Sequence, residues 1–357
     1  MTFSAPASAA TWGLLALAPA PNTLVPPSRY GSLLTWLRDQ DAEISPKLSI
    51  RPGGRGDGYG AVVTEDVREG EVLFTVPRVA CLTLLDATED PDCGAGLSDL
   101  MEKAGPGSDT VVMAGYMAKE YLAYEARGGD GGGSEGLFGP YLSTLPWERG
   151  ANGQEHVLFW SDDDVEKNLG GTFCYDETVA LRDELDLAVK YLNGIIGPSV
   201  RSARGEDVES ENDDEGAFKW PWEAKEATAA KGMVEGVPEA VRGAFVSLLT
   251  RSFEDASDGE VINREKLVPL LDMLQHSVEP NVQHAMRKTD GTVVVEAIRD
   301  MVAGTELLNQ YRPEEEETMP NHRFFSRFGF VPGKSNDDIP GMLADKQSAF
   351  YPQQAEV

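Results

Sequence analysis

The sequence predicts an α+β fold in which two β-rich segments, residues 47–90 and 258–332, flank a mainly α-helical stretch. Two patterns support this prediction. Short strand-like runs between turn residues occur near both ends of the region. Between them, apolar residues recur at helical spacing. With 41% hydrophobic residues in a chain of 357, there is ample apolar material for a buried core.

The amino-terminal half is predicted to contain one helix, then strands, then more helix. Residues 30–41 form a short amphipathic helix, because their apolar residues share a helical face. Residues 48–79 alternate apolar runs with Gly-rich turns, a pattern typical of a β-meander. Helical spacing returns over residues 95–128. The Gly-rich segment 128–136 is predicted to be a flexible loop, since ordering glycine costs the most backbone entropy.

The second half is predicted to contain two further helices before the strands resume. Amphipathic patterns indicate helices over residues 176–193 and 238–253. Between them, residues 205–216 are strongly acidic and almost without apolar residues, which predicts a solvated or disordered surface loop. Residues 261–330 are predicted to form short strands and turns, with TVVVEAI at 292–298 as the clearest strand.

Both ends of the sequence are predicted to be tails. Residues 1–28 are rich in Ala, Ser and Pro without a basic residue, which favours a disordered tail and leaves a targeting role open. Residues 333–357 are likewise predicted to be disordered. The sequence contains no stretch of about twenty apolar residues, so no membrane span is predicted. The compartment stays open among cytoplasm, nucleus and plastid.

Charge and cysteine content exclude several classes of function. The chain has 31 basic and 60 acidic residues, a net charge of -29. Nucleic-acid binding is therefore disfavoured, because phosphate backbones need clustered Lys and Arg. The acidic field favours basic partners, or simply keeps the protein soluble. The three cysteines and four histidines lack the spacing of a disulfide framework or a metal site, so no metal is predicted.

Four alternate glycines, Gly54, Gly56, Gly58 and Gly60, superficially suggest a phosphate-binding loop. They lead into a strand, whereas such loops lead into a helix whose amino terminus receives the anion. A dinucleotide site is therefore not predicted here. A tight β-turn is the simplest interpretation.

Residues 267–282 (LVPLLDMLQHSVEPNV) and 304–330 (GTELLNQYRPEEEETMPNHRFFSRFGF) resemble the carboxy-terminal half of a SET domain. Upstream, residues 54–77 resemble the family's Gly-rich strand pair. Residues 137–146 and 157–172 are similar to the helical insert of the Rubisco large-subunit methyltransferase-like branch. The resemblance implies a SET domain over 29–332: an amino-terminal part (47–90), a helical insert (91–257) and a carboxy-terminal part (258–332) closed by a pseudoknot.

The resemblance implies an enzyme, an S-adenosylmethionine-dependent protein-lysine N-methyltransferase. In this family a lysine amine attacks the sulfonium methyl group across a narrow channel. A free lysine, with a pKa near 10.4, must first lose its proton, at a cost of about 4 to 5 kcal/mol near pH 7. A desolvated channel and a nearby positive sulfonium favour the neutral amine. Positioning supplies much of the remaining rate enhancement.

The resemblance also assigns roles to residues. Tyr311 corresponds to the catalytic tyrosine, and Phe328 to a residue that lines the substrate channel. The positions that correspond to cofactor-binding residues are Gly58, Tyr59, Gly60, Arg251, Asp272, Gln275, His276 and Phe330. Simpler interpretations stay open: Tyr311 as a core tyrosine, Arg251 as an ordinary helix residue, and Asn281, which also matches the family, as a turn former.

Three departures from the family pattern qualify the prediction. Gln275 replaces the Asn that holds the cofactor's ammonium group, and Phe328 replaces a Tyr. Glu314–Glu317 add four consecutive acids near Tyr311, which form either a solvated loop or a docking site for a basic peptide. Gln275 and Phe328 motivate one alternative, a SET-fold binding module with little or no turnover. A second alternative is the same enzyme class acting on histidine, as in one related branch, because these residues do not identify the nucleophile. The expected partner is a protein with an exposed lysine in a basic segment, with Rubisco or another organelle enzyme left open; we expect a monomer that binds neither nucleic acid nor membrane.

Overall fold

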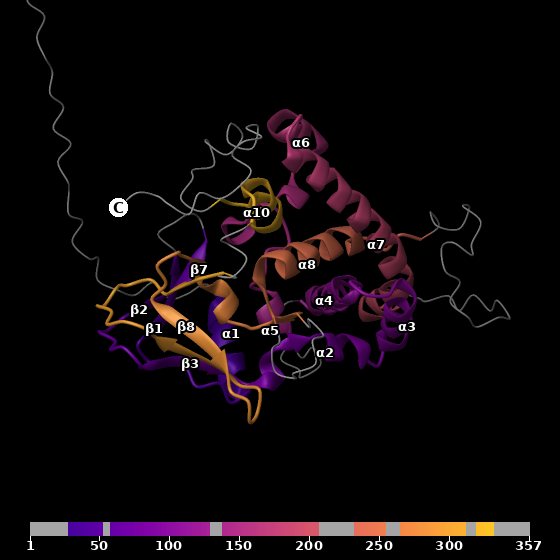
Figure 1. Cartoon of the computed structure of the whole chain (residues 1–357). Helices are drawn as coiled ribbons and strands as arrows, with labels where there is room; N and C mark the ends of the chain where they lie inside the picture. Colours follow the sequence, from indigo (N-terminus) through magenta and orange to yellow (C-terminus); the bar gives the residue numbers. More distant parts are fainter. Residues whose placement is uncertain are drawn as a thin grey trace, which may run out of the picture.

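The structure, a computed structural model, describes residues 28–52, 58–128, 138–206, 232–254, 265–311 and 319–331. The short strands gather on one side of the molecule and the long helices lie on the other (Figure 1). The predicted α+β class is confirmed. Within these ranges no helix is long and apolar enough to span a membrane.

Helix α1 (Ser28–Asp39) matches the predicted lead-in helix and buries Tyr30, Leu33 and Leu37. It is followed by β1 (Leu48–Pro52) and β2 (Tyr59–Val63), which pair antiparallel from Leu48 opposite Val63 to Pro52 opposite Tyr59. The tip of this hairpin, which carries Gly54 and Gly56, lies outside the described residues.

The predicted β-meander is wrong at its third strand. Strand β3 (Val72–Val76) does not pair with β2; it pairs with β9 (Val293–Ala297), more than 200 residues later. Four of its five residues are buried, although β3 lies at an edge of its sheet, where Ile44 forms a β-bridge with Phe74. The hydrophobic pattern of β3 indicates burial but not the strand that pairs with it. Strand β8 (Val282–Met286) completes the order β3-β9-β8.

Two further sheets join distant segments of the chain. Strand β4 (Leu82–Thr83) pairs with β6 (Glu265–Leu267), which also pairs with β5 (Ser252–Glu254). Strand β7 (Gln275–His276) runs parallel to β10 (Leu308–Asn309). This parallel pair is the part of the predicted pseudoknot that the described residues show. The first and last β segments thus form one β-rich unit.

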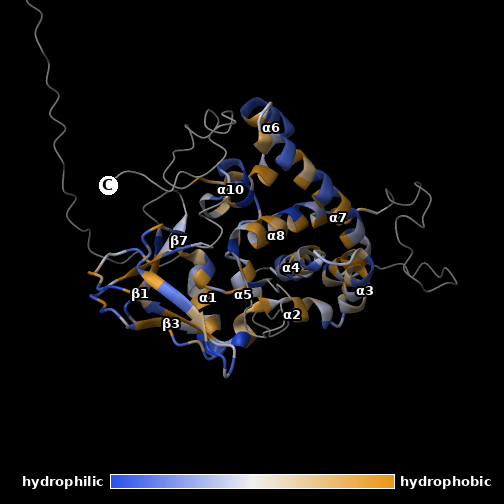
Figure 2. Ribbon diagram, in the orientation of Figure 1, coloured by the Kyte–Doolittle hydropathy of each residue, from blue (hydrophilic) through white to orange (hydrophobic). Residues whose placement is uncertain are grey.

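Helices fill the middle of the chain. They are α2 (Leu84–Thr88), α3 (Gly94–Ala104), α4 (Asp109–Ala126), α5 (Gly139–Leu142), α6 (Asp162–Leu169), α7 (Phe173–Ala203) and α8 (Val237–Arg251). Short 3₁₀ turns are η1 (Arg78–Ala80), η2 (Ala151–Gly153), η3 (Val157–Phe159) and η4 (Leu271–Met273). Helix α4 packs against α7 and α8 and is buried from residue 112 to 120. Hydrophobic and hydrophilic residues alternate around α7, as expected of a helix with one face on the core (Figure 2).

Three helices differ from the prediction: two in their boundaries and one that was not predicted. Helix α7 extends well beyond residues 176–193, because buried residues such as Ile196 and Val200 continue its core face through Pro198. Helix α8 ends at Arg251, where the chain turns into β5. Residues predicted as strands and turns include the helix α10 (Asn321–Phe328), which ends at Gly329 with a φ of 79°. That left-handed conformation favours glycine.

One cluster of buried apolar side chains spans the sheets and the helices, including Phe74 and Val295 from the strands and Leu97, Leu192 and Val241 from the helices. The helical insert therefore shares its core with the β-rich unit. Almost all of the Gly-rich loop, most of the acidic loop, Glu314–Glu317 and both tails lie outside the described residues. The domain boundaries stay predictions.

Candidate active site

Tyr311 lies in a cluster of aromatic rings built from β7, α10 and the residues after each. Its ring centroid is 5.2 Å from that of His276, 5.9 Å from Phe328 and 6.4 Å from Phe330. Phe324 packs 4.8 Å from Phe328 and completes the cluster. The structure thus brings together four of the residues that the sequence assigned to the site.

Hydrogen bonds fix the position of Tyr311. Its hydroxyl donates to the carbonyl oxygen of Leu274 at 2.7 Å, and its backbone N–H donates to Nδ1 of His276 at 3.3 Å. Because Nδ1 accepts, the neutral His276 ring carries its proton on Nε2. The tyrosine oxygen, having donated its proton to Leu274, keeps acceptor capacity toward the cluster.

Asn281 holds the strand that leads to Tyr311. Its side-chain amide donates to the carbonyl of Glu306 and accepts from the N–H of Leu308, both at 2.7 Å. It is 2% exposed, so the two bonds are shielded from water. Asn281 therefore fixes β10 beside β7, a more specific role than that of a turn former.

Asp272 lies in a buried polar group with Tyr141 and Arg251. The Tyr141 hydroxyl donates to Oδ2 of Asp272 at 3.0 Å. Nη1 of Arg251 lies 3.5 Å from the same oxygen and donates to the Asp272 carbonyl at 3.1 Å. Burial raises the pKa of Asp272, while Arg251 and Tyr141 oppose that rise. The sequence missed Tyr141, although it stands in the LFGPYLSTLP segment that carries the family resemblance.

The turn Gly58–Gly60 lies beside η4, because β2 packs against that segment. The Tyr59 ring packs against Tyr30 of α1 at a tilt of 36°, with ring centroids 4.7 Å apart. A Cβ on Gly60 would lie 2.6 Å from Oε1 of Glu306, so only glycine fits here without displacing that carboxylate. The sequence assigned no role to Glu306. Gln275 is half-buried and pairs with Leu308.

The helical insert holds the end of α10. His156 is fully buried; its Nδ1 accepts from the N–H of Leu158 at 3.2 Å, so its Nε2 donates to the carbonyl of Arg327 at 3.1 Å. Gln154 donates to the carbonyl of Phe328 at 3.4 Å. Burial lowers the pKa of His156 to about 4, which keeps the ring neutral. The sequence gave no signal for His156 beyond a lone histidine before the apolar run VLFW.

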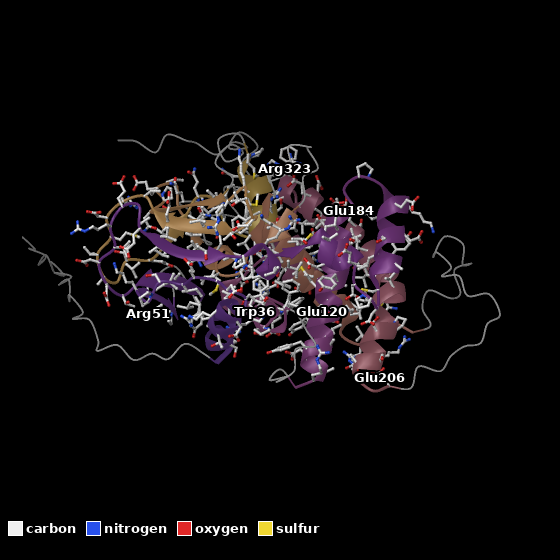
Figure 3. The ribbon with its side chains drawn as sticks, turned by 90° about the horizontal axis from the view of Figure 1, so that it is seen from below. Trp36, Arg51, Glu120, Glu184, Glu206 and Arg323 are labelled. Atoms are coloured by element: carbon white, nitrogen blue, oxygen red, sulfur yellow. The ribbon has the colours of Figure 1, made fainter. Side chains whose placement is uncertain are left out.

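A cleft of about 630 Å³ lies between α7, α8 and α10. Glu177 and Glu184 line its α7 side, and Arg323 and Arg327 its α10 side. Figure 3 labels Glu184 and Arg323 on these two helices. Arg327 also lies over the Phe328 ring, with its Cζ 5.6 Å from the ring centroid, so the cleft adjoins the aromatic cluster around Tyr311. In the described ranges no three His, Cys, Asp or Glu residues are grouped to hold a metal.

Comparison with known proteins agrees with this geometry. The family model described as "SET domain" matches residues 58–312, more than half of the chain. The chain belongs to the SET domain family. The match begins after β1, at residue 58, includes the helices of the insert and ends just beyond Tyr311.

The chain is similar to N-lysine methyltransferase setd6 of Xenopus laevis, with 26% identity over 90% of this chain and 62% of that protein. The relative from Bos taurus, N-lysine methyltransferase SETD6, is 23% identical over 87% of this chain and 59% of its own length. The chain thus spans about three-fifths of these relatives' length.

Solved structures show the same fold. The SET domain of LSMT bound to lysine and AdoHcy matches with a TM-score of 0.57 and 14% identity, over 87% of this chain and 58% of that one. Rubisco LSMT bound to AdoMet matches with the same TM-score and identity, over 87% of this chain and 57% of that one. At this identity the likeness concerns the fold.

Proposed function

We propose that this SET domain is an S-adenosylmethionine-dependent protein-lysine N-methyltransferase. The observation that carries the proposal is the position of the Tyr311 hydroxyl, 2.7 Å from the Leu274 carbonyl and surrounded by His276, Phe328 and Phe330. A tyrosine oxygen and a backbone carbonyl at the end of an aromatic cluster suit an amine that must be desolvated and oriented. The relatives named above as N-lysine methyltransferases support the same activity.

The residues around this cluster fit the cofactor. Arg251 presents a partly exposed guanidinium, 14% accessible, that suits a carboxylate. Burial raises the pKa of Tyr30, and the charge of the nearby Arg251 opposes this rise. The Tyr30 ring also packs against Tyr59 of the Gly58–Gly60 segment. His276 and Phe330, whose rings are 5.9 Å apart, suit the flat adenine. When bound, the cofactor supplies the electrophilic sulfonium methyl group.

The chain's own residues would orient the amine and favour its neutral form. The Tyr311 oxygen accepts a hydrogen bond from the lysine ε-amine, since its own proton is donated to Leu274. The phenyl rings of Phe328 and Phe330 exclude water, and burial in an apolar environment lowers the pKa of a lysine. Hydrogen bonds through Asn281 and His276 hold Tyr311 in place, so little reorganisation is needed.

The test is titration calorimetry with S-adenosylmethionine, followed by transfer of a labelled methyl group into a lysate. Mass spectrometry of the products then identifies lysine or histidine as the acceptor. We expect Tyr311→Phe to bind the cofactor within about threefold of the parent while methyl transfer falls about 100-fold or more. Binding without transfer by the parent would favour the binding-module alternative. Absence of binding would refute the proposal.

We also propose that the substrate lysine lies in a basic, exposed segment, such as those of ribosomal proteins or histones. The net charge of -29 supports this, because opposite charge accelerates encounter. Replacing Glu314–Glu317, which lie outside the described residues, with Gln should slow turnover on a basic peptide at low salt. The effect should fade at about 0.5 M salt, where screening is strong. Equal behaviour of mutant and parent at both salts would remove the electrostatic argument. We also propose that the protein is a monomer and that it binds neither nucleic acid nor membranes.

A further inference from the structure

The Glu306 carboxylate has one buried oxygen that lacks a hydrogen-bond partner in the described part of the chain. Its Oε1 is buried and makes no hydrogen bond, and no ion pair joins Glu306 to another residue of the described ranges. A buried acceptor without a donor costs stability, so such an atom calls for an explanation. This oxygen lies close to Gly60, where an added Cβ would be 2.6 Å away, but glycine offers no positive charge.

The backbone on both sides fixes the direction of the Glu306 side chain. Glu306 forms a β-bridge with Val62, and the N–H of Leu307 donates to the carbonyl of Ala61 at 2.8 Å. Leu307 is fully buried, and side chains alternate along an extended segment, so Glu306 points to the other face. On that face it shares a side with Leu308, the residue in register with Gln275. The carboxylate therefore lies over the Gly58–Gly60 turn and on the Gln275 side of β10.

A positive charge lies near the same segment. Arg251 supplies a cation beside η4, which packs against β2. A ligand with a carboxylate at Arg251 and an ammonium at Glu306 would meet both charges. An α-amino acid group has this pair of charges. Gln275, which is neutral and half-buried, can assist but cannot neutralise an ammonium.

We propose that Glu306 is the counter-ion for the α-ammonium of the cofactor's amino acid end. The inference rests on the proposed function and assigns a contact that the sequence did not. It explains how a chain with Gln275 at the Asn position can still hold the ammonium group. A charge-assisted bond to a desolvated carboxylate is stronger than a neutral one.

The test compares two ligands by titration calorimetry with the full chain: S-adenosylhomocysteine and its deaminated counterpart, which lacks only the α-amino group. In the parent, we expect the deaminated ligand to bind more weakly. Glu306→Gln should weaken binding of S-adenosylhomocysteine by about 10- to 100-fold and change binding of the deaminated ligand by less than about twofold. Glu306→Asp, which keeps the charge, should recover part of the loss. Glu69→Gln, an exposed site, is the control for net charge and should change neither affinity.

The outcomes separate the inference from the proposed function. If Glu306→Gln weakens both ligands equally, or neither, Glu306 does not bind the ammonium group and the inference is wrong while the proposed function stands. If the parent binds neither ligand, the proposed function fails and the inference falls with it. Thermal unfolding of each variant shows whether it is folded. Should Glu306→Gln not fold, the same two-ligand comparison with Glu306→Asp decides, since a shortened carboxylate should weaken only the ligand that carries the amine.

Discussion

Tyr141→Phe should destabilise the protein by breaking a single hydrogen bond to a buried carboxylate. Oδ2 of Asp272 accepts from the Tyr141 hydroxyl at 3.0 Å and otherwise meets only Nη1 of Arg251 at 3.5 Å. Oδ1 of the same carboxylate has no partner in the described part of the chain. Phenylalanine keeps the ring and its packing, so the change isolates the hydroxyl.

The magnitude follows from the charge on Asp272. A hydrogen bond to a charged group contributes about 1.5 to 3 kcal/mol, and a neutral one about 1 kcal/mol. Burial raises the folded-state pKa of Asp272 above its value in the unfolded chain. The protein therefore loses stability as pH rises from the unfolded pKa through the folded one, because the buried carboxyl must ionise. The Tyr141 hydroxyl lowers the pKa of Asp272, so Tyr141→Phe increases this loss of stability.

We therefore expect Tyr141→Phe to cost about 2 kcal/mol at pH 7 and about 1 kcal/mol near pH 4. Denaturant unfolding at both pH values measures the difference. Tyr121→Phe is the matched control: Tyr121 stacks on Trp147 at 3.9 Å, and its hydroxyl makes no hydrogen bond to any described residue. A loss at Tyr141 that equals the control, or that does not change with pH, would refute the reasoning.

Three further predictions concern the site and the segments that hold it. Gln275→Asn should tighten cofactor binding by at most a few-fold in calorimetry; an unchanged affinity would mean that Gln275 has turned away from the site. Gly60→Ala should cost at most about 1 kcal/mol in denaturant unfolding, because its Cβ would lie 2.6 Å from the far end of the Glu306 side chain, which can shift. His156, whose pKa burial lowers to about 4, contributes stability that is complete above pH 6.5 and lost as pH falls toward 4. That loss, about 3 kcal/mol, should disappear from the pH profile of His156→Gln, which keeps a donor for Arg327.

Local patterns predicted those elements whose burial is decided within one segment. Helix α1 and strand β9 follow their apolar periodicity to within two residues. The partner of β3 could not be predicted, because its sequence requires burial on both faces without saying which strand supplies it. Helix α10 was missed because it is only eight residues long and its phenylalanines, at positions 324, 325 and 328, also suit a strand.

Some site residues could likewise be predicted from the sequence and others could not. The resemblance predicted Tyr311, His276, Phe328 and Phe330, which the structure brings into one cluster. It did not predict Tyr141, His156 or Glu306. The importance of a buried polar residue depends on the group that satisfies it, and those groups lie 131 residues from Tyr141 and 171 residues from His156. Sequence motifs carry residue types, but not these distant partners.

The helical insert does more than separate the two β segments. Tyr141 of α5 binds the carboxylate that positions Arg251, and His156 before η3 binds the helix end that carries Phe328. The Tyr141 contact is buried and the His156 contact is partly buried, and each leaves a polar group unsatisfied when broken. The folding of the insert is therefore coupled to the positions of Arg251 and Phe328, on both sides of Tyr311. Since such coupling is reciprocal, a ligand that orders the site must also stabilise α5 and η3.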